Sequence, residues 1–396
     1  MITIPLIHLS SLLNSQDEAL LKEETAFLGA INASDEFAFV PPIQGAQAVF
    51  YVQTGGSEPL FLSCYEDYPE PYLILVTGER NSLAASLEML SFLQAKGKKG
   101  KIIMGKPEEI AASLRREFGF LEAKKRLVGT RYGVIGKPSD WLIASPVSAK
   151  EAKQRLGVEV VDVDYQEFLD AIDGIKEVPA PLLKRFSDKT NRQEDLYESL
   201  RIYLALKGIC ARHNLSGFTL RCFDLLTLRH QTSCLAFGLL GEEGIIAGCE
   251  GDVPAMLTMA LVKALYGYVP FMANPSHFDL ETGVAIFAHC TIPFSFVTSY
   301  SLSTHFESGL GFGIRGKVKE GPITAIKLSS DYSDIMCLEG RVKSNPEIPT
   351  MCRSQIEVDL GDGLRRILDR PHGNHMIFLF GYKGQEIADF LTYLRD

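Results

Sequence analysis

A short apolar run at residues 245–247 is followed within a few residues by Glu250, and then by a helical pattern over 253–268. Pro254 falls in the first turn of that pattern, where its missing N–H would have had no partner. The segment therefore predicts a buried strand that ends near a carboxylate and leads into a helix. Open α/β sheets place their ligand crevices at this end of a strand. A carboxylate there needs a cation, a proton or several donors to offset its desolvation.

Three further polar side chains stand at the edges of apolar runs. Asn274 follows the run at 269–273, His289 follows 284–288, and His375 precedes 376–380. Together with Glu250 they form an O/N ligand set that suits a divalent metal such as Mn²⁺. On spacing alone, core strands whose polar ends cap loops are the more common explanation. Convergence of the four side chains is therefore a hypothesis that needs further support.

The charge and the cysteines limit the class of protein. A net charge of −9 without a Lys/Arg stripe argues against nonspecific binding to nucleic acid or to an anionic membrane surface. The eight cysteines include no CxxC pair, which is typical of free thiols in a reducing compartment. The N-terminus lacks the positively charged start of a secretory signal. We therefore expect a cytoplasmic protein.

The pattern of elements changes along the chain. Residues 1–130 and 131–283 each alternate strand-like and helical runs, whereas strand-like runs with Gly, Pro and Asp turns dominate 284–396 before a terminal helical pattern. We expect an α/β protein with an N-terminal domain at 1–130, a second domain at 131–283 that carries Glu250, and a β-rich, barrel-like domain at 284–396. The first two are expected to be Rossmann-like α/β domains.

Several segments resemble those of the L-fucose isomerase and L-arabinose isomerase superfamily, and they occur in the same order. They run from about residue 54 to 381, most of the chain: Thr54-Gly55-Gly56-Ser57-Glu58, Asn81-Ser82-Leu83-Ala84, Val134 to Leu142, Cys249-Glu250-Gly251-Asp252, His305 to Gly309, and Gly373-Asn374-His375. The order of the segments, more than any one of them, is specific. The chain is therefore similar to fucose isomerase-like proteins, although the segments do not fix the substrate.

The resemblance implies an activity and a metal. Family members interconvert an aldose and a ketose through an enediolate, with Mn²⁺ or another divalent metal bound by acidic side chains and histidine. Glu250 matches the first acid, which serves as both ligand and base, and His375 matches the late histidine. His289 matches an additional histidine of the arabinose branch. The resemblance further implies a monosaccharide or modified-sugar substrate in carbohydrate metabolism and a homo-oligomer, a trimer or hexamer.

Asn274 departs from the family pattern, because it falls where the family has an acid. Its amide oxygen can coordinate a hard cation, but it cannot act as a base. Three interpretations follow: a nearby acid (Asp252, Asp279 or Glu307) takes over, one carboxylate works with water, or the chain binds a sugar without isomerising it. The alternatives to an isomerase are thus a non-catalytic sugar-binding or regulatory protein and an epimerase on the same scaffold.

Two acids near these motifs are candidate catalytic residues with structural alternatives. Asp252 lies in the first turn of the expected helix, where capping is as good an explanation as catalysis. Glu307 is close in sequence to His305, and either could bind a sugar hydroxyl, although an exposed loop is an equal alternative.

Three further residues are candidate substrate-binding groups. Lys137 and Trp141 lie on a strand-to-helix turn, where Trp141 could stack on a sugar or fill a domain interface. Arg221, like Arg353, could bind an anionic substituent, although buried ion pairing is the more frequent role.

Overall fold

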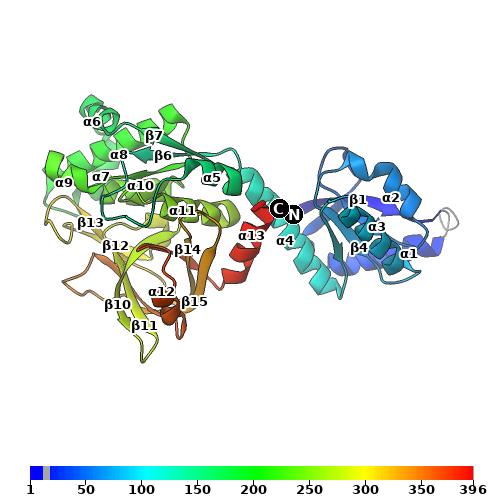
Figure 1. Cartoon of the computed structure of the whole chain (residues 1–396). Coiled ribbons are helices and arrows are strands. Elements are labelled where there is room, and N and C mark those ends of the chain that lie inside the picture. Colours follow the sequence, from blue (N-terminus) through cyan, green and yellow to red (C-terminus); the bar gives the residue numbers. More distant parts are fainter. Residues whose placement is uncertain (12–17, 396) are drawn as a thin grey trace. The chain divides into compact units, whose positions relative to one another are not determined.

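The computed structural model describes residues 1–11 and 18–395 and divides into two compact units, Met1–Glu122 and Ala123–Arg395 (Figure 1). The first unit contains a parallel five-stranded sheet of order β2-β1-β3-β4-β5. Its strands are β1 (Ile2–Leu9), β2 (Phe37–Val40), β3 (Val49–Val52), β4 (Tyr72–Val76) and β5 (Gly100–Ile103). Its helices are α1 (Glu18–Ile31), α2 (Glu58–Cys64), α3 (Ser82–Ala95) and α4 (Pro107–Leu127), the last of which continues into the second unit.

Both faces of this sheet are covered. Val49 and Tyr51 of β3 belong to a core that includes residues of α1 and α4, whereas Phe50 and Val52 belong to a core with residues of α2 and α3. Successive side chains of a strand point to opposite faces, so a strand covered on both sides reads as a continuous apolar run. This explains why all of β3 is buried.

The second unit begins with a parallel four-stranded sheet of order β7-β6-β8-β9. Its strands are β6 (Arg131–Ile135), β7 (Glu159–Val163), β8 (Gly217–Leu220) and β9 (Ile246–Cys249). Its helices are α5 (Ala149–Leu156), α6 (Tyr165–Gly174), α7 (Ala180–Ser187), α8 (Gln193–His213), α9 (Phe223–Arg229), α10 (Cys234–Glu242) and α11 (Val253–Tyr266).

A closed six-stranded barrel follows, with the order β10-β11-β16-β15-β14-β17 and β17 paired back to β10. All of its ladders are antiparallel. The strands are β10 (Phe271–Asp279), β11 (Val284–His289), β14 (Gly321–Leu328), β15 (Ile335–Ser344), β16 (Ser354–Asp359) and β17 (Met376–Phe380). A separate pair, β12 (Ser299–Ser303) and β13 (Gly313–Lys317), and two helices, α12 (Gly363–Asp369) and α13 (Gly384–Arg395), complete the unit.

Helix α11 lies between the parallel sheet and the barrel. It packs on β8 and β9 on one side and on β14 and β17 on the other, and nearly all of its residues are buried. A helix that is apolar all round needs such a two-sided environment. Asp252 caps its start by accepting the N–H of Ala255 at 2.8 Å, Pro254 occupies its first turn, and Gly267 ends it at a φ of +79°. The turn that carries Glu250 is thereby held between two layers.

The parallel α/β sheets and the C-terminal barrel confirm the predicted class, whereas the assignment of two Rossmann-like domains and the three predicted boundaries stay predictions. Glu250 follows β9, His289 ends β11 and His375 directly precedes β17, as expected. The expected end of a strand at Asn274 is wrong, because β10 continues to Asp279 past a register irregularity between Pro275 and His277.

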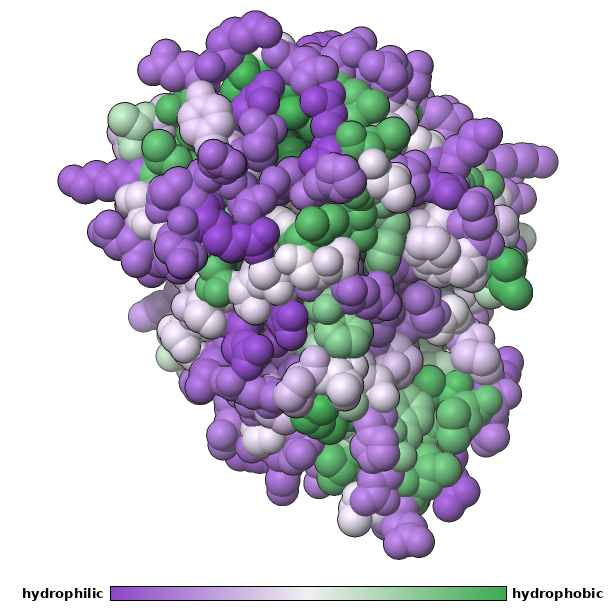
Figure 2. All heavy atoms as spheres, turned by 90° about the vertical axis from the view of Figure 1, so that its left-hand side faces the viewer, coloured by the Kyte–Doolittle hydropathy of each residue, from purple (hydrophilic) through white to green (hydrophobic). Residues whose placement is uncertain are grey.

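Figure 2 shows hydrophilic residues over most of one face, with smaller groups of hydrophobic residues between them. Among the described residues, no helix is both long and apolar enough to cross a membrane.

Candidate metal centre

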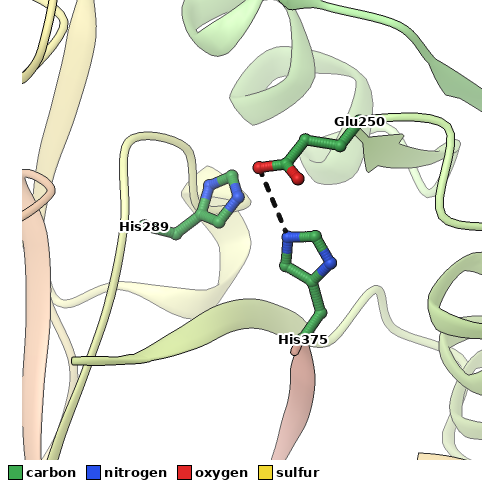
Figure 3. A group of neighbouring side chains, drawn as sticks. All are labelled: Glu250, His289 and His375. Atoms are coloured by element: carbon green, nitrogen blue, oxygen red, sulfur yellow. Dashed lines mark ion pairs between the residues drawn. The ribbon is translucent and has the colours of Figure 1, made fainter. Parts of the chain in front are cut away.

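Three side chains that are distant in sequence converge in the second unit. One potential ligand atom from each of Glu250, His289 and His375 lies within 4.8 Å of the other two, and all three residues are buried (Figure 3). Glu250 comes from the turn after β9, His289 from the end of β11, and His375 from the residue before β17. The parallel sheet thus supplies the carboxylate and the barrel supplies both imidazoles. This group could hold a metal ion.

The turn at Glu250 has an unusual backbone. Glu250 and Gly251 have φ values of +63° and +77°, a region that side-chain-bearing residues rarely adopt. A Cβ atom on Gly251 would lie 2.5 Å from the Cα of Pro138, so only glycine fits there. The N–H of Ser139 donates to the carbonyl of Glu250 at 2.8 Å and joins this turn to the segment after β6.

The carboxylate of Glu250 is held by two groups. Trp141 donates its indole N–H to Oε2 at 2.7 Å, and Nε2 of His375 lies 3.7 Å from Oε1. Burial alone would raise the pKa of Glu250, but His375 and the indole N–H lower it overall. The side chain is therefore a carboxylate at neutral pH, and Figure 3 shows Oε1 turned toward His375.

His375 is fully buried and presents one free lone pair when it is neutral. Its Nδ1 lies 2.9 Å from Oδ2 of Asp252, and its Nε2 has no hydrogen-bond partner among the described residues. Because a carboxylate only accepts, it keeps the proton of a neutral imidazole on Nδ1 and leaves the Nε2 lone pair facing Glu250. Burial opposes the charged imidazolium, but Asp252 and Glu250 raise the pKa of His375 overall.

His289 differs from His375 in its pKa and in its hydrogen bonding. Burial, reinforced by His375, lowers its pKa to about 3, so the ring is neutral. Its Nδ1 accepts the N–H of Thr291 at 3.2 Å, which places the ring proton on Nε2. A cation can use His289 only after the ring turns or its proton moves to the other nitrogen. His289 is therefore less prepared than His375 to act as a ligand.

A pocket adjoins this group. It encloses about 550 Å³ of space, its open mouth included, and Glu250, His289, Asn274, His305 and Glu307 are on its walls. The cavity itself is small, about 90 Å³. Asn274 lies beside β11 and its Oδ1 accepts from Nδ2 of Asn374 at a long 3.4 Å. The role of Asn274 as a ligand stays a prediction.

Five thiols also line the pocket, and the sequence pattern did not single them out as site residues. They are Cys222, Cys234, Cys249, Cys290 and Cys352, all free. The sequence indicates free thiols but carries no signal that these five meet. In the structure the Sγ atoms of Cys222 and Cys249 lie 2.8 Å apart.

The remaining candidate residues do not line the pocket. Asp252 is completely buried behind His375, and Trp141 is half exposed above Glu250. Arg221 is engaged by Asp140 and by Asp224 at 2.9 Å each, and neither Arg221 nor the exposed Lys137 lines the pocket. A role of Arg221 and Lys137 in substrate binding stays a prediction that the pocket does not support.

The chain is similar to curated proteins named sulfoquinovose isomerase. One from Alkalicoccus urumqiensis is 24% identical over 266 residues, which cover 63% of this chain and 59% of that protein. Those from Priestia aryabhattai and Priestia megaterium (strain ATCC 12872 / QMB1551) are 22% identical over 297 residues, covering 70% of this chain and 66% of each relative. The chain thus spans 59% to 66% of the length of these relatives.

No protein-family model matches the chain. An alanine racemase-like protein of Idiomarina loihiensis aligns with a TM-score of 0.14 and 10% identity over 98% of this chain and 90% of that structure. A TM-score this low carries no information about the fold.

Proposed function

We propose that this chain is a metal-dependent aldose–ketose isomerase that acts on a sugar. The observation that carries the proposal is the convergence of the Glu250 carboxylate with Nε2 of His375 beside a pocket, where this nitrogen has no hydrogen-bond partner in the part of the chain that the structure describes. The sulfoquinovose isomerases to which the chain is similar support the same reaction class. Those names also make a sulfonated sugar the first substrate to test.

The residues of the site fit a divalent cation such as Mn²⁺. A buried carboxylate and an imidazole lone pair without a partner are the donors that such an ion uses, and the ion would offset the burial of Glu250. We propose Glu250 and His375 as the principal ligands and His289 and Asn274 as additional ones. A bound ion would act as a Lewis acid toward the oxygens of the sugar.

Glu250 is the proposed general base. Its lowered pKa keeps it unprotonated, the form in which it can take a proton from one sugar carbon and return it to the next through an enediolate. Trp141 fixes one oxygen of this carboxylate and directs the other toward His375. Asn274, on the pocket wall, can position a hydroxyl but cannot move this proton.

We propose that a second acid, rather than water, moves the hydroxyl protons, and three acids are candidates. Glu307 lines the pocket, whereas Asp279 does not and Asp252 is completely buried. We therefore propose Glu307 as the second acid, with His305 on the same wall as a donor to a sugar hydroxyl. If Glu307 does not serve, the substitution at Asn274 favours the alternatives of a non-catalytic sugar-binding protein or an epimerase.

The test is hydrogen exchange in deuterated water. The protein is incubated with Mn²⁺ and a panel of aldoses and ketoses that includes sulfoquinovose, and Glu250→Gln is the matched control because it keeps shape and removes the base. We expect deuterium at C1 or C2 with the wild type only. Binding of a sugar without exchange in either protein would reject the isomerase and favour the binding protein.

We also propose that the protein is cytoplasmic and that it forms a homo-oligomer. The assembly state has a test of its own. Light scattering of the purified chain gives the assembly state directly. A strictly monomeric protein with full activity would show that no neighbouring subunit is needed to complete the site.

A further inference from the structure

A lysine and an aspartate form a fully buried pair behind His375. Nζ of Lys327, on β14, lies 2.9 Å from Oδ2 of Asp252, and neither side chain has any exposed surface. The same Oδ2 lies 2.9 Å from Nδ1 of His375, while Oδ1 accepts the N–H of Ala255. One carboxylate oxygen thus joins the lysine to the histidine, and the other caps α11.

Neither packing nor capping requires this pair. A helix start is capped equally well by Asn or Ser, which carry no charge. Four other residues of β14 (Ile323, Ala325, Ile326 and Leu328) are buried and apolar, so an apolar residue would suit position 327. Burying two charges usually gives no gain in stability over apolar residues of similar size. The pair therefore calls for a role other than stability.

The surroundings of Lys327 connect it to the segment that carries His375. A ring nitrogen of His372 lies 3.1 Å from the carbonyl of Lys327, which ties this segment to β14. Gly373, with a φ of +99°, lies beside the lysine stem, where a Cβ would be in van der Waals contact with Cε at 3.7 Å. The backbone before β17 and the lysine side chain are thus fitted to each other.

We propose that Asp252 and Lys327 are positioning residues that orient His375 toward Glu250. Lys327 fixes Oδ2 of Asp252 next to Nδ1 of His375, and this carboxylate keeps the imidazole proton on Nδ1. The Nε2 lone pair of neutral His375 then faces Glu250, where the proposed function places the ion. The inference rests on that proposed function. Asp252 acts through His375 and does not touch the reacting atoms.

Three variants test the inference: Asp252→Asn, Lys327→Met, and the two combined. Asn keeps the cap of α11 and the side-chain volume, and Met keeps the length of the lysine stem. We expect each single variant to weaken Mn²⁺ binding about 10- to 100-fold, the usual effect of removing a partner behind a ligand histidine. Mn²⁺ affinity is measured by fluorescence titration, since Trp141 is the single tryptophan of the chain and contacts Glu250.

The double variant separates positioning from structure, because it strands no charge in the interior. If it folds with a wild-type unfolding midpoint and still binds Mn²⁺ weakly, the positioning role is supported. If it binds Mn²⁺ as tightly as the wild type, the inference is overturned.

A measurement on the wild type covers the case in which the variants do not fold. In metal-free protein, ¹⁵N NMR of the histidine rings should show a proton on Nδ1 of His375 and none on Nε2 in its neutral form. A neutral ring protonated on Nε2 overturns the inference. Failure of the wild type to bind Mn²⁺ at all, with the Nδ1 proton present, would instead reject the proposed function.

Discussion

Alanine at Gly251 is expected to destabilise the second unit far more than alanine at Gly267. The two glycines flank the same helix and have almost the same φ, +77° and +79°. They differ in what a Cβ would meet. At Gly267 nothing lies within 4 Å, whereas at Gly251 three backbone atoms of Lys137 and Pro138 lie at 2.5 to 3.0 Å. Comparing Gly251→Ala with Gly267→Ala therefore separates the cost of conformational strain from that of steric overlap.

The expected sizes follow from these contacts. A left-handed φ costs a side-chain-bearing residue about 1–2 kcal/mol, and alanine recovers about 0.4–1 kcal/mol by restricting the unfolded chain. Gly267→Ala should thus lower the unfolding free energy by about 1 kcal/mol. Gly251→Ala adds the displacement of rigid backbone, about 1–3 kcal/mol by analogy with overpacked cores, for a total of about 2–4 kcal/mol.

Thermal unfolding followed by circular dichroism measures the difference. For a domain of this size 1 kcal/mol corresponds to about 2–4 °C, so we expect falls in Tm of about 2–4 °C for Gly267→Ala and about 4–16 °C for Gly251→Ala. Only the second variant should also weaken Mn²⁺ binding, because its turn carries Glu250. Equal falls in Tm would refute the assignment of Gly251 to a sterically closed site.

Three further predictions concern the metal centre. His375→Ala should lower Mn²⁺ content in elemental analysis much more than His289→Ala. Nε2 of His375 has no hydrogen-bond partner among the described residues, whereas Nδ1 of His289 already accepts the N–H of Thr291; equal losses would contradict this order. Trp141→Phe should keep the fold and lower kcat with little change in KM, because it releases one oxygen of Glu250. A rise in KM at unchanged kcat would instead indicate that Trp141 stacks on the sugar. In metal-free protein, His289 should account for a loss of about 1.6 kcal/mol of stability between pH 6.5 and pH 5. It titrates near 3 when folded but near 6.5 when unfolded, so the unfolded chain binds the extra proton as the pH falls. His375, whose pKa is raised, acts in the opposite direction, so the difference between the wild type and His289→Gln isolates the share of His289. Denaturant titrations across this window should give a flatter profile for His289→Gln, and an unchanged slope would show that His289 is not responsible.

The sequence predicted the parts of the site that leave a local pattern. Glu250 was found because an apolar run precedes it and a helix with Pro254 follows, and these are short-range signals. His289 and His375 were found at strand edges for the same reason. That these residues meet depends on the closure of the barrel and on its contact with α11, which is a long-range property. Only the resemblance to known isomerases predicts that these residues meet.

Other features had no local signal or a misleading one. Strand β1 has a misleading local signal, because Pro5 lies inside it and a proline argues against an interior strand. The structure accommodates Pro5 where β1 changes partner, since residues 2–5 pair with β2 and residues 6–9 pair with β3. Lys327 has no local signal of its burial, because a single lysine in an apolar strand is usually exposed. Its burial follows from Asp252, which is far away in sequence.

The position of α11 between two layers has a consequence for assembly of the protein. Glu250 and Asp252 belong to the sheet side of this helix, whereas His289, His375 and Lys327 belong to the barrel side. An ion that needs both sides binds only the docked form, and at a free concentration 100 times its Kd it would add about 2.7 kcal/mol to the stability of that form. Removal of the proposed metal would then make the second unit easier to unfold and so more open to proteolysis.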